Sequence, residues 1–515
     1  MVRLNANHKY LDEAGNTIRI FFPGAKILIC DCESGSREMA PKLRQPHPLT
    51  RFALDAWRDC LTSVNECNLF ISSPFEHLTI VSKLLDSSAY AEIFASGKSV
   101  SKYVWTLEKK DGFLTHSRML MLSLFHALQK IKPTITPWGA LTGIRPTKLV
   151  RQWLDEGVSE SGAEAFLQNP YQVSKEKAKL ALQVAITENR LRDLIYERGE
   201  KTAGLYINIP FCASRCFYCS FTCMEKPPTD GFLGDYTGVL VREIMEKLGV
   251  TKKGGFTVTS IYIGGGTPTF LPAGLLHKIL HSLRDVISAD VEFTVEGGRP
   301  DSISSEKLKL LKEFGVTRFC VNPQTLNEQT LDRIGRKHTM KEFYDAFSLV
   351  RKFGFKCVSS DVIAGLPGEG LKDMENTISK LIELKPENIT VHNLAIKRAS
   401  KLKTHHQSIL GDGDMQTVRG MLTLAADSLN EAGYTPYYLY RQKDMLGLGE
   451  NVGYSRDGFW CRYNIGMMSE VQTIIGAGAG AVTKYVDGDK ITREFNVKNP
   501  ELYVLARTKT THREN

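Results

Sequence analysis

Hydrophobic and polar positions follow a repeating order between about residue 200 and residue 395. Short apolar runs with a strand-like pattern alternate with longer stretches in which apolar residues recur at helical spacing. EKLKLLKEFG and MKEFYDAFSLVRKFG are two of these stretches, and each ends in glycine, as helices commonly do. The predicted strands are Leu205–Ile209, Thr257–Ile263, Val291–Val295, Thr317–Val321, Lys356–Ile363 and Asn388–Leu394.

Six strand–helix repeats predict an α/β fold. Right-handed crossovers between successive strands give a parallel sheet covered by helices, either doubly wound or curled into a partial barrel. Reactive groups collect at the carboxyl ends of the strands in such folds. Polar or glycine-rich motifs do lie at the six predicted strand ends, and in chain order they are IPFC, GGGTPT, Glu296 after the third strand, Asn322-Pro323-Gln324, Asp361 and His392-Asn393.

The length of 515 residues predicts two or three domains. Residues 201–395 form the α/β part. Residues 1–200 are expected to form an α+β domain with a packing or docking role; within it PWGALTGIRPTKLVRQWLDEG looks like a turn entering a basic helix, and another helix begins near Ser174. Residues 396–515 contain the glycine-rich IIGAGAGAVTKY and are expected to fold back and close the barrel.

The composition narrows the class of protein. No run approaches about 18 apolar residues, and no apolar segment follows the charges of MVRLNANHKYLDEAG, so we expect a cytoplasmic protein without a membrane span or secretory signal. The net charge of +9 comes from scattered basic residues. Nucleic-acid binding is therefore not indicated, and a mixed solvated surface or anionic small molecules explain the bias equally well.

Four of the eleven cysteines lie close together in the sequence. Cytosolic thiols are normally reduced, so a disulfide framework is not expected. The remaining seven are spread out, and we interpret most of them as small buried residues. These seven are Cys30, Cys32, Cys60, Cys67, Cys320, Cys357 and Cys461.

Cys212, Cys216 and Cys219 form a C-x3-C-x2-C run after the first strand. Three thiolates can hold three irons of a [4Fe–4S] cubane and leave the fourth iron open. An open iron is what chelation of S-adenosylmethionine (SAM) through its amino and carboxylate groups requires. Zinc, with Cys223 as a fourth ligand, is the main alternative, although zinc usually takes two separated pairs of ligands. The run predicts a radical enzyme that cleaves SAM.

Polar residues at the neighbouring strand ends could bind SAM. GGGTPT allows a ligand to approach the backbone, and it lacks the Lys-Ser/Thr of a phosphate loop, although a simple turn is an equal alternative. Glu296 could pair with an ammonium group, Arg336 with a carboxylate and Asp361 with hydroxyls, while Gln324 shares their rim. A residue of each of these types is, taken alone, more often a surface or capping group. The prediction of a SAM site depends on all four lying at the same rim of the sheet.

The chain resembles the radical-SAM family of oxygen-independent coproporphyrinogen III dehydrogenases over roughly residues 200 to 485. The resemblance is carried by the cysteine run, GGGTPT, VNPQTLNEQTLDRIGRKHT and DVIAGLPGE. GIRPTKL and HNLAIKRAS resemble its HemZ-type branch, which carries an extra N-terminal domain. The resemblance implies a partial (β/α)6 barrel with an N-terminal α+β domain and a C-terminal extension. It also implies a [4Fe–4S] cluster and one or two SAM molecules as cofactors.

The resemblance assigns roles to individual residues. Tyr206 would contact the cluster-bound SAM, and together with the cluster ligands Cys212, Cys216 and Cys219 it forms the predicted catalytic set. Further predicted SAM contacts are Gly265, Glu296, Gln324, Arg336, Asp361 and Ala395. Positions matching those near a second SAM are Tyr218, Gly266 and Thr267.

The implied reaction belongs to heme biosynthesis. SAM is cleaved to methionine and a 5′-deoxyadenosyl radical, which removes a hydrogen atom from the β-carbon of a propionate. Carbon dioxide leaves, an acceptor takes the remaining electron, and a vinyl group forms; two rounds give protoporphyrinogen IX. The implied partners are a tetrapyrrole substrate and an electron donor such as flavodoxin or ferredoxin. The carboxylates of the tetrapyrrole could be bound by Lys397, Arg398 and Lys401. It is equally possible that these three residues are only part of the solvated surface.

One departure from the family pattern leaves the activity open. The dehydrogenases have a further cysteine two residues after the third ligand, where this chain has Phe221, and Cys223 lies two residues later. Related heme-trafficking proteins carry phenylalanine at this position and bind heme without decarboxylating coproporphyrinogen. A heme chaperone is therefore one alternative, and another radical-SAM reaction on a tetrapyrrole, such as methyl transfer or ring opening, is a second.

Overall fold

The computed structural model describes residues 2–6, 10–22, 27–31, 78–85, 88–95, 98–106, 115–134, 136–143, 145–195, 201–225, 227, 229, 231–397, 400, 402, 412–488 and 490–511. The chain forms two compact units. The first comprises Met1–Gly143 and Glu156–Ala178, and the second comprises Ile144–Asp155 and Lys179–Asn515. The division into domains at residues 200 and 395 stays a prediction.

The first unit is an α+β structure. Its five-stranded sheet has the order β2-β1-β3-β4-β5, with β1 parallel to both neighbours and the other pairs antiparallel. Helix α3 packs on this sheet, and Phe125 of α3 contacts Phe21 of α1 with ring centroids 5.2 Å apart. The elements are β1 (Val2–Ala6), α1 (Leu11–Phe21), β2 (Ile27–Asp31), β3 (Leu78–Leu85), β4 (Ser88–Ala95), β5 (Lys98–Thr106), α3 (His116–Ile131) and α5 (Glu160–Gln168).

The second unit contains the six predicted strands, which pair in parallel and in chain order. This arrangement confirms the partial (β/α)6 barrel. Glu296 lies inside the third strand rather than after it, because pairing continues to Gly298. The strands are β6 (Thr202–Ile209), β7 (Thr257–Gly265), β8 (Glu292–Gly298), β9 (Arg318–Val321), β10 (Cys357–Ala364) and β11 (Asn388–Asn393).

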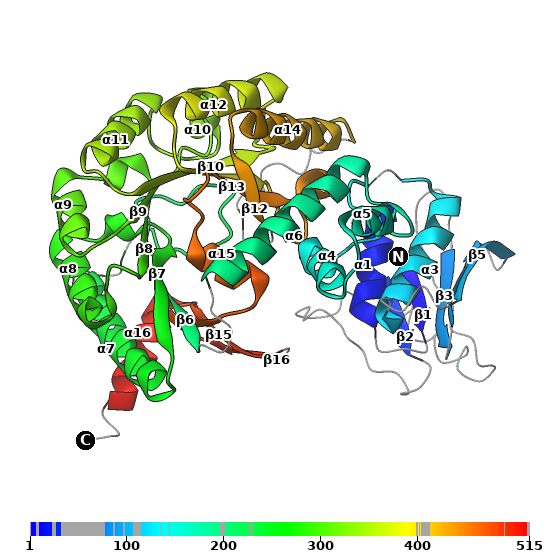
Figure 1. The fold of residues 1–515 in the computed structure, drawn as a ribbon, viewed down its shortest axis with the longest axis horizontal. Helices are drawn as coiled ribbons and strands as arrows, with labels where there is room; N and C mark the ends of the chain where they lie inside the picture. Colours follow the sequence, from blue (N-terminus) through cyan, green and yellow to red (C-terminus); the bar gives the residue numbers. More distant parts are fainter. Residues whose placement is uncertain are drawn as a thin grey trace, which may run out of the picture. The chain divides into compact units, whose positions relative to one another are not determined.

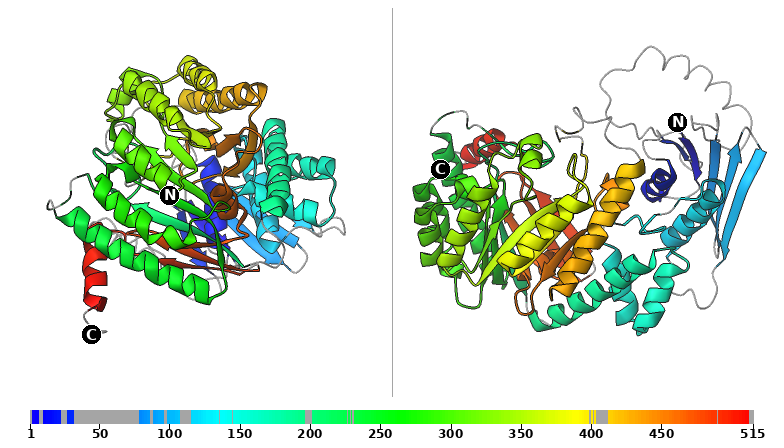
Figure 2. Two further views of the ribbon diagram at one scale, coloured as in Figure 1. Left: turned by 60° about the vertical axis from the view of Figure 1, so that its left-hand side comes forward. Right: turned by 90° about the horizontal axis from the view of Figure 1, so that it is seen from above.

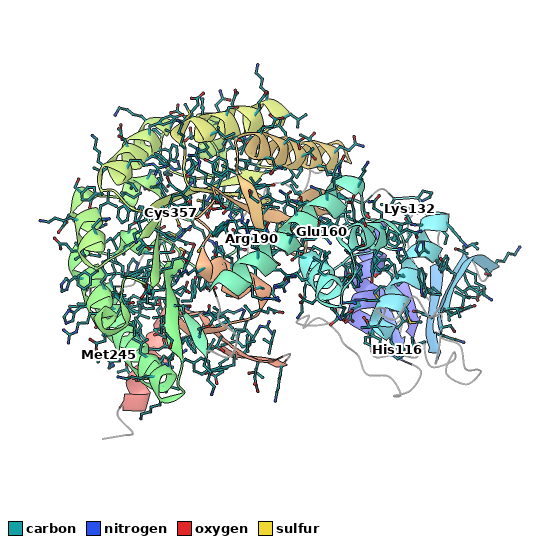
Figure 3. The ribbon with its side chains drawn as sticks, viewed as in Figure 1. His116, Lys132, Glu160, Arg190, Met245 and Cys357 are labelled. Atoms are coloured by element: carbon teal, nitrogen blue, oxygen red, sulfur yellow. The ribbon has the colours of Figure 1, made fainter. Side chains whose placement is uncertain are left out.

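The connecting helices lie along the outer side of this sheet, and Figures 1 and 2 show them from three directions. Both predicted amphipathic stretches are helices, and Ser304 and Thr339 cap their N-termini with side-chain hydrogen bonds. Met245 of α7 points outward, whereas Cys357 is buried in the sheet (Figure 3). The helices are α7 (Phe232–Lys253), α8 (Ala273–Ser282), α9 (Ser305–Glu313), α10 (Glu328–Arg333), α11 (Met340–Lys352) and α12 (Leu371–Leu384).

The C-terminal residues extend the sheet at both edges. Strand β14 pairs in parallel with β6, and β13 pairs antiparallel with β11. The first of these pairings confirms that IIGAGAGAVTKY folds back on the barrel. The added elements are α14 (Asp412–Glu431), β12 (Thr435–Tyr440), β13 (Asn451–Ser455), α15 (Arg462–Ser469), β14 (Thr473–Ala477), β15 (Val482–Asp487), β16 (Lys490–Phe495) and α16 (Pro500–Thr511). Among the described helices, none combines the length and apolar character needed to cross a bilayer.

The basic GIRPTKL segment leads into α4 (Pro146–Asp155), which caps the C-terminal end of α15. Arg151 is buried, donates to the Ser469 carbonyl at 3.0 Å and lies 3.3 Å from Glu188 of α6 (Lys175–Ile195). Arg145 and Lys148 pair with Glu470, the C-cap residue of α15. Cations at this end oppose the partial negative charge of the helix carbonyls. The segment therefore fixes the position of α15.

We predict that Arg151→Met destabilises the protein more at pH 8 than at pH 5.5. Burial raises the pKa of Glu188 from 4.5 to about 7, so in the folded protein this carboxyl is neutral at pH 5.5 and charged at pH 8. Removing its partner from the charged form costs about 3–5 kcal/mol, and the neutral form loses less. Thermal melting at both pH values measures the difference.

Lys148→Met on the same helix is the control, because the Lys148 side chain is 58% exposed and its ion pair contributes about 0–1 kcal/mol. Equal destabilisation by Arg151→Met at the two pH values would contradict the prediction.

Candidate active site at the strand ends

The three cysteines lie on a closed loop between β6 and α7. The Met224 amide donates to the Pro210 carbonyl at 2.8 Å, and the Cys212 amide donates to the Met224 carbonyl at 3.2 Å. The Phe217 amide donates to the Ile334 carbonyl at 2.8 Å, which joins the loop to the end of α10. These backbone bonds hold the thiols in fixed positions on one loop.

Two buried arginines lie beside this loop. Arg299 forms a bidentate pair with Asp301, at 3.0 and 2.8 Å, and donates to the Ser214 hydroxyl at 2.7 Å. Arg336 is 5% exposed and donates to the carbonyls of Gly298 at 2.9 Å and Asn322 at 2.5 Å. The loop is thereby tied to the carboxyl ends of β8 and β9.

The thiols differ in their ease of ionisation. A hydrogen bond from Cys223 is the main cause that lowers the pKa of Cys212 to about 7; Thr267, whose hydroxyl is 3.3 Å from the Cys212 sulfur, and the two arginines also lower it, against the effect of burial. Burial raises the pKa of Cys219 to about 11. The hydrogen bond with Cys212 raises the pKa of Cys223, and burial adds to it. Cys212 is therefore the readiest thiolate of these three.

The cysteine loop fits the donor set of a [4Fe–4S] cluster. Within the described ranges, no three Cys, His, Asp or Glu side chains are grouped as ligands of one metal ion would be. A cubane does not need such a group, because each thiolate binds a different iron. Arg336 adds a second observation, since its Nη1 lies 3.7 Å from the Cys216 sulfur and its buried Nε donor has no hydrogen-bond partner. A carboxylate bound beside the loop could satisfy that donor.

Glu296 of β8 and Asp361 of β10 bring two carboxylates to the same edge of the sheet, with β9 between their strands. The Tyr262 hydroxyl donates to Glu296 at 2.5 Å. Burial, and secondarily Asp361, raise the pKa of Glu296 to about 7, although the Tyr262 and Gly265 hydrogen bonds oppose this shift. Asp361 accepts a 2.9 Å hydrogen bond from the Asn322 amide and lies 3.6 Å from His392 Nε2. The pair offers negative charge to a cationic ligand.

Tyr206 is held by contacts at its hydroxyl and its ring. The hydroxyl donates to Asn208 Oδ1 at 3.1 Å, and the ring stacks on Tyr463 of α15 with centroids 6.0 Å apart. Tyr463 also stacks on Tyr262 at 4.6 Å. The three rings form one wall of the barrel interior.

Two predicted glycines lie where the backbone approaches closely. Gly265 has φ +111°, and a Cβ at this position would clash with Asn208 Oδ1. A Cβ on Gly266 would lie 2.5 Å from the Phe211 carbonyl oxygen. Gly265 therefore allows β7 to lie close to the end of β6, and Gly266 allows contact with the start of the cysteine loop.

The remaining predicted residues lie around the cysteine loop and at the ends of the later strands. Thr267 contacts Cys212, and Gln324, at φ +68°, has a buried side-chain oxygen without a hydrogen-bond partner. The ring of Tyr218 packs against the apolar cluster of Ile334, Ile363, Leu366, Leu394 and Leu402, and its hydroxyl interacts with Cys216 and Arg336. Ala395 bridges to Met445. Of the basic residues proposed for the substrate, Arg398 and Lys401 lie outside the described residues.

Several residues of the site were not predicted. Asn322 was predicted only as part of a polar strand end and not as the partner of Asp361. Tyr262 lies on a predicted strand and is the direct partner of Tyr206 in the β6–β7 register. Strand pairing could have identified Tyr262. Tyr463 comes from a C-terminal helix, and its own sequence carries no comparable signal. Asn208 is visible only as a polar residue in an otherwise apolar strand.

Comparison with known proteins agrees with these features. Residues 206–381 match the radical SAM superfamily. The oxygen-independent coproporphyrinogen-III oxidase-like protein HemZ of Bacillus subtilis is 39% identical over 406 residues, which are 77% of this chain and 80% of HemZ. The heme chaperone HemW of the same organism is 32% identical over 304 residues, 58% of this chain and 74% of HemW. The solved structure of coproporphyrinogen III oxidase HemN from Escherichia coli is 21% identical with a TM-score of 0.49, covering 63% of this chain and 72% of HemN.

We predict that Cys216→Ala loses the cluster whereas Cys223→Ala retains it, because only the C-x3-C-x2-C thiolates are needed for a cubane with an open iron. Iron and sulfide analysis after anaerobic reconstitution measures both variants. Loss of metal from Cys223→Ala as well would indicate a site with four sulfur ligands and contradict the assignment.

We also predict that affinity for SAM rises about tenfold between pH 6 and pH 8. A carboxyl with a pKa of about 7 is mostly protonated at the lower pH and mostly ionised at the higher one, and the ionised form is the stronger acceptor for the amino group of SAM. Anaerobic calorimetry on the cluster-loaded protein measures this affinity. Glu296→Gln should flatten the profile, and an unchanged slope in this variant would show that another group is responsible.

Proposed function

This chain belongs to the radical-SAM superfamily and, within it, to the family of HemZ-like coproporphyrinogen-III oxidase-like proteins, and from that premise we propose that it converts coproporphyrinogen III to protoporphyrinogen IX without oxygen. The observation that carries the proposal is the meeting of the cysteine loop, Arg336, Glu296 and Asp361 at one edge of the sheet. These groups match what a cluster and a zwitterionic SAM would require.

The residues of this edge have separate tasks in the proposed reaction. Cys212, Cys216 and Cys219 hold the cluster, which when bound supplies the electron that cleaves SAM into methionine and a 5′-deoxyadenosyl radical. The unsatisfied Nε of Arg336 binds the methionine carboxylate, and ionised Glu296 accepts a hydrogen bond from the amino group. Their fixed positions orient the bond to be broken before the reaction begins.

Aromatic side chains near the site are consistent with a substrate built of pyrrole rings. Partly buried aromatic and thioether side chains pack around the buried cluster of Tyr437, Tyr438 and Tyr463, and these are Tyr206, Tyr262, Tyr440, Trp460, Met467 and Met468. Burial is the main cause that raises the pKa of the tyrosine hydroxyls, to about 12 for Tyr440, so they remain hydrogen-bond donors at neutral pH. Aromatic rings suit the pyrroles of such a macrocycle, and the protonated Tyr440 hydroxyl suits one of its carboxylates.

Each round of the proposed reaction removes a hydrogen atom, carbon dioxide and one electron from one propionate. The β-hydrogen atom goes to the 5′-deoxyadenosyl radical, the carboxylate leaves as carbon dioxide, and an external acceptor takes one electron. The remaining two carbons form the vinyl group. Exclusion of water from the tyrosine-lined interior protects the radical during this sequence.

A heme chaperone is the second candidate function. It is favoured by the similarity to HemW and by Phe221, which is 68% exposed two residues after Cys219. An exposed aromatic side chain beside the site could stack on heme.

An anaerobic assay decides between these functions. The reconstituted protein receives dithionite, SAM and coproporphyrinogen III, and mass spectrometry follows the porphyrin, methionine and 5′-deoxyadenosine. Loss of two formic-acid equivalents supports the proposal. SAM cleavage with a different mass change indicates another tetrapyrrole reaction, and absence of SAM cleavage with tight heme binding indicates the chaperone. Cys216→Ala serves as the blank.

If the protein is a chaperone, Phe221→Ala should weaken heme binding by about tenfold, because one stacking contact with heme is lost. Phe495→Ala on β16 is the matched control, because Phe495 is also 68% exposed. Heme titration followed by absorbance measures both variants. Equal affinities would remove Phe221 from the argument for a chaperone.

A further inference from the structure

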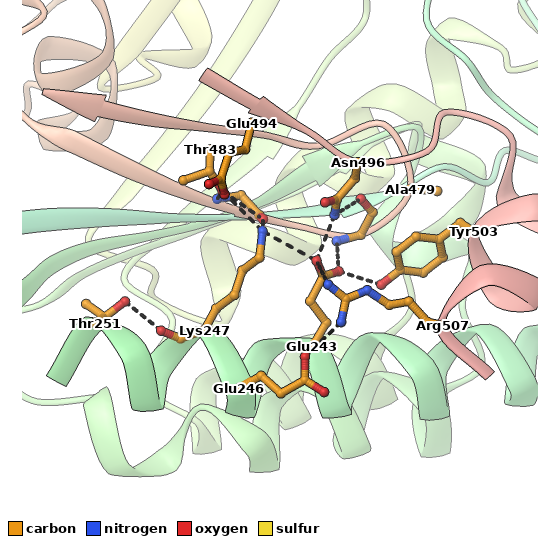
Figure 4. A network of polar contacts seen from close by, with 12 residues as sticks. Glu243, Glu246, Lys247, Thr251, Ala479, Thr483, Glu494, Asn496, Tyr503 and Arg507 are labelled. Atoms are coloured by element: carbon orange, nitrogen blue, oxygen red, sulfur yellow. Dashed lines mark hydrogen bonds and ion pairs between the residues drawn. The ribbon is translucent and has the colours of Figure 1, made fainter. Parts of the chain in front are cut away.

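A fully buried carboxylate joins α7 to the C-terminal helix. Glu243 of α7 accepts hydrogen bonds from the Tyr503 hydroxyl at 2.6 Å, from Arg507 at 2.7 Å and from the Asn496 amide at 2.8 Å (Figure 4). We call these four residues the Glu243 lock. Two of the three donors lie in α16 and the third, Asn496, lies just before it, so Glu243 gathers the contacts of this end of the chain. Arg507 also donates to Glu246 of α7 at 2.8 Å.

The lock also holds a backbone amide of the glycine-rich turn. The Gly478 amide donates to Glu243 at 2.8 Å, and the Asn496 side chain donates to the Gly478 carbonyl at 2.9 Å. Gly478 has φ +100°, and a Cβ on it would clash with the Asn208 carbonyl oxygen. The turn therefore lies directly against the end of β6.

Asn208 continues this contact to the predicted catalytic tyrosine. Its side-chain amide donates to the Ala479 carbonyl at 2.5 Å, and its side-chain oxygen accepts from the Tyr206 hydroxyl at 3.1 Å. Tyr236 adds a parallel contact, because its hydroxyl accepts from the Ala479 amide at 3.0 Å and donates to the Asn208 carbonyl at 2.9 Å. A continuous path therefore runs from α16 to Tyr206, through hydrogen bonds to Gly478, the peptide bond to Ala479, and hydrogen bonds from Ala479 to Asn208 and on to Tyr206.

We propose that the Glu243 lock is a positioning device through which α16 fixes the orientation of Tyr206. Tyr503 and Arg507 act as positioning residues, since they reach the site only through the glycine turn and Asn208. A buried carboxylate keeps its geometry only while its donors are present, and loss of one donor favours reorientation or entry of water. The Gly478 amide would then lose its acceptor, and the turn would relax away from Asn208.

Strand β14, which leads into the glycine-rich turn, has a second attachment to α7 that does not involve α16. Lys247 donates to the Gly476 carbonyl and, at 3.1 Å, to the Thr483 hydroxyl, and it lies 3.4 Å from Glu243. Strand β14 should therefore stay in place when a donor from α16 is removed. This separation makes it possible to disturb the turn without unfolding the sheet.

The test compares Tyr503→Phe with Tyr485→Phe. Both changes remove a tyrosine hydroxyl that is bonded to a glutamate, and the Tyr485 hydroxyl lies 3.1 Å from Glu494 on the exposed β15–β16 hairpin. Arg507→Met and Arg507→Lys form a second pair, in which lysine keeps the charge. The first readout is hydrogen exchange of the Gly478 and Ala479 amides in the cluster-free protein. The second is the KM for SAM and the kcat for 5′-deoxyadenosine formation.

We expect exchange at these two amides to be about tenfold faster in Tyr503→Phe and Arg507→Met, with smaller changes in Arg507→Lys and none in Tyr485→Phe. The KM for SAM should rise by about two- to thirtyfold, with a smaller change in kcat, because Tyr206 would lose orientation while the cluster ligands stay in place. Unchanged exchange at Gly478 and Ala479, or an increase spread evenly over the barrel, would overturn the proposal.

The proposal rests on the proposed function only in the role of Tyr206. If the wild-type protein does not cleave SAM, the proposed function fails, and the exchange measurement still decides whether the lock controls the turn. If SAM is cleaved but exchange and KM are unaffected in both α16 variants, the lock fails and the proposed function stands. Should Tyr503→Phe not fold, Arg507→Met compared with Arg507→Lys decides the matter.

Discussion

The backbone pairing between the end of β7 and the start of the cysteine loop is the constraint on which the site depends. The β6–β7 ladder continues past both strands, since the Gly266 amide donates to the Ile209 carbonyl at 2.8 Å and the Thr267 amide donates to the Phe211 carbonyl at 2.8 Å. This continuation brings Thr267 to Cys212 and leaves no space for a Cβ at position 266. Because the six strands are parallel, the same edge also receives Glu296, Asp361 and the arginines.

Two buried arginines beside the cysteine loop add positive charge to the site that the backbone pairing positions. Arg299 and Arg336 are both buried, and each has carbonyl or carboxylate partners that keep it in place. Burial and these two cations lower the pKa of the neighbouring His338 to about 3, so this imidazole stays neutral and adds no further positive charge. Two fixed cations in a region of low dielectric favour thiolates and a bound carboxylate over their protonated forms. The environment therefore suits the anionic ligands of a cluster.

The parts that could be predicted from the sequence are those with local signals. Alternating apolar patterns located all six strands, and the spacing of Cys212, Cys216 and Cys219 identified the loop. Glu296 was predicted to follow the third strand but lies within it. The last residues of a strand look like a polar loop when the strand's pairing partner is unknown. The partners of the GIRPTKL segment could not be predicted, since Glu470 lies more than 300 residues away and no period relates them. Contacts of this kind depend on the packed fold, which a local pattern does not contain.

Tyr206 shows how such distant contacts converge on one residue. Its ring is stacked on Tyr463 of α15, and α15 is held at its other end by Arg151 of α4. Its hydroxyl is bonded to Asn208, which the glycine turn holds through Ala479. The two supports are independent, because one acts on the ring through stacking and the other on the hydroxyl through hydrogen bonds. A tyrosine fixed at both ends loses little further freedom when a ligand binds, so the entropy of orienting it is already spent in folding.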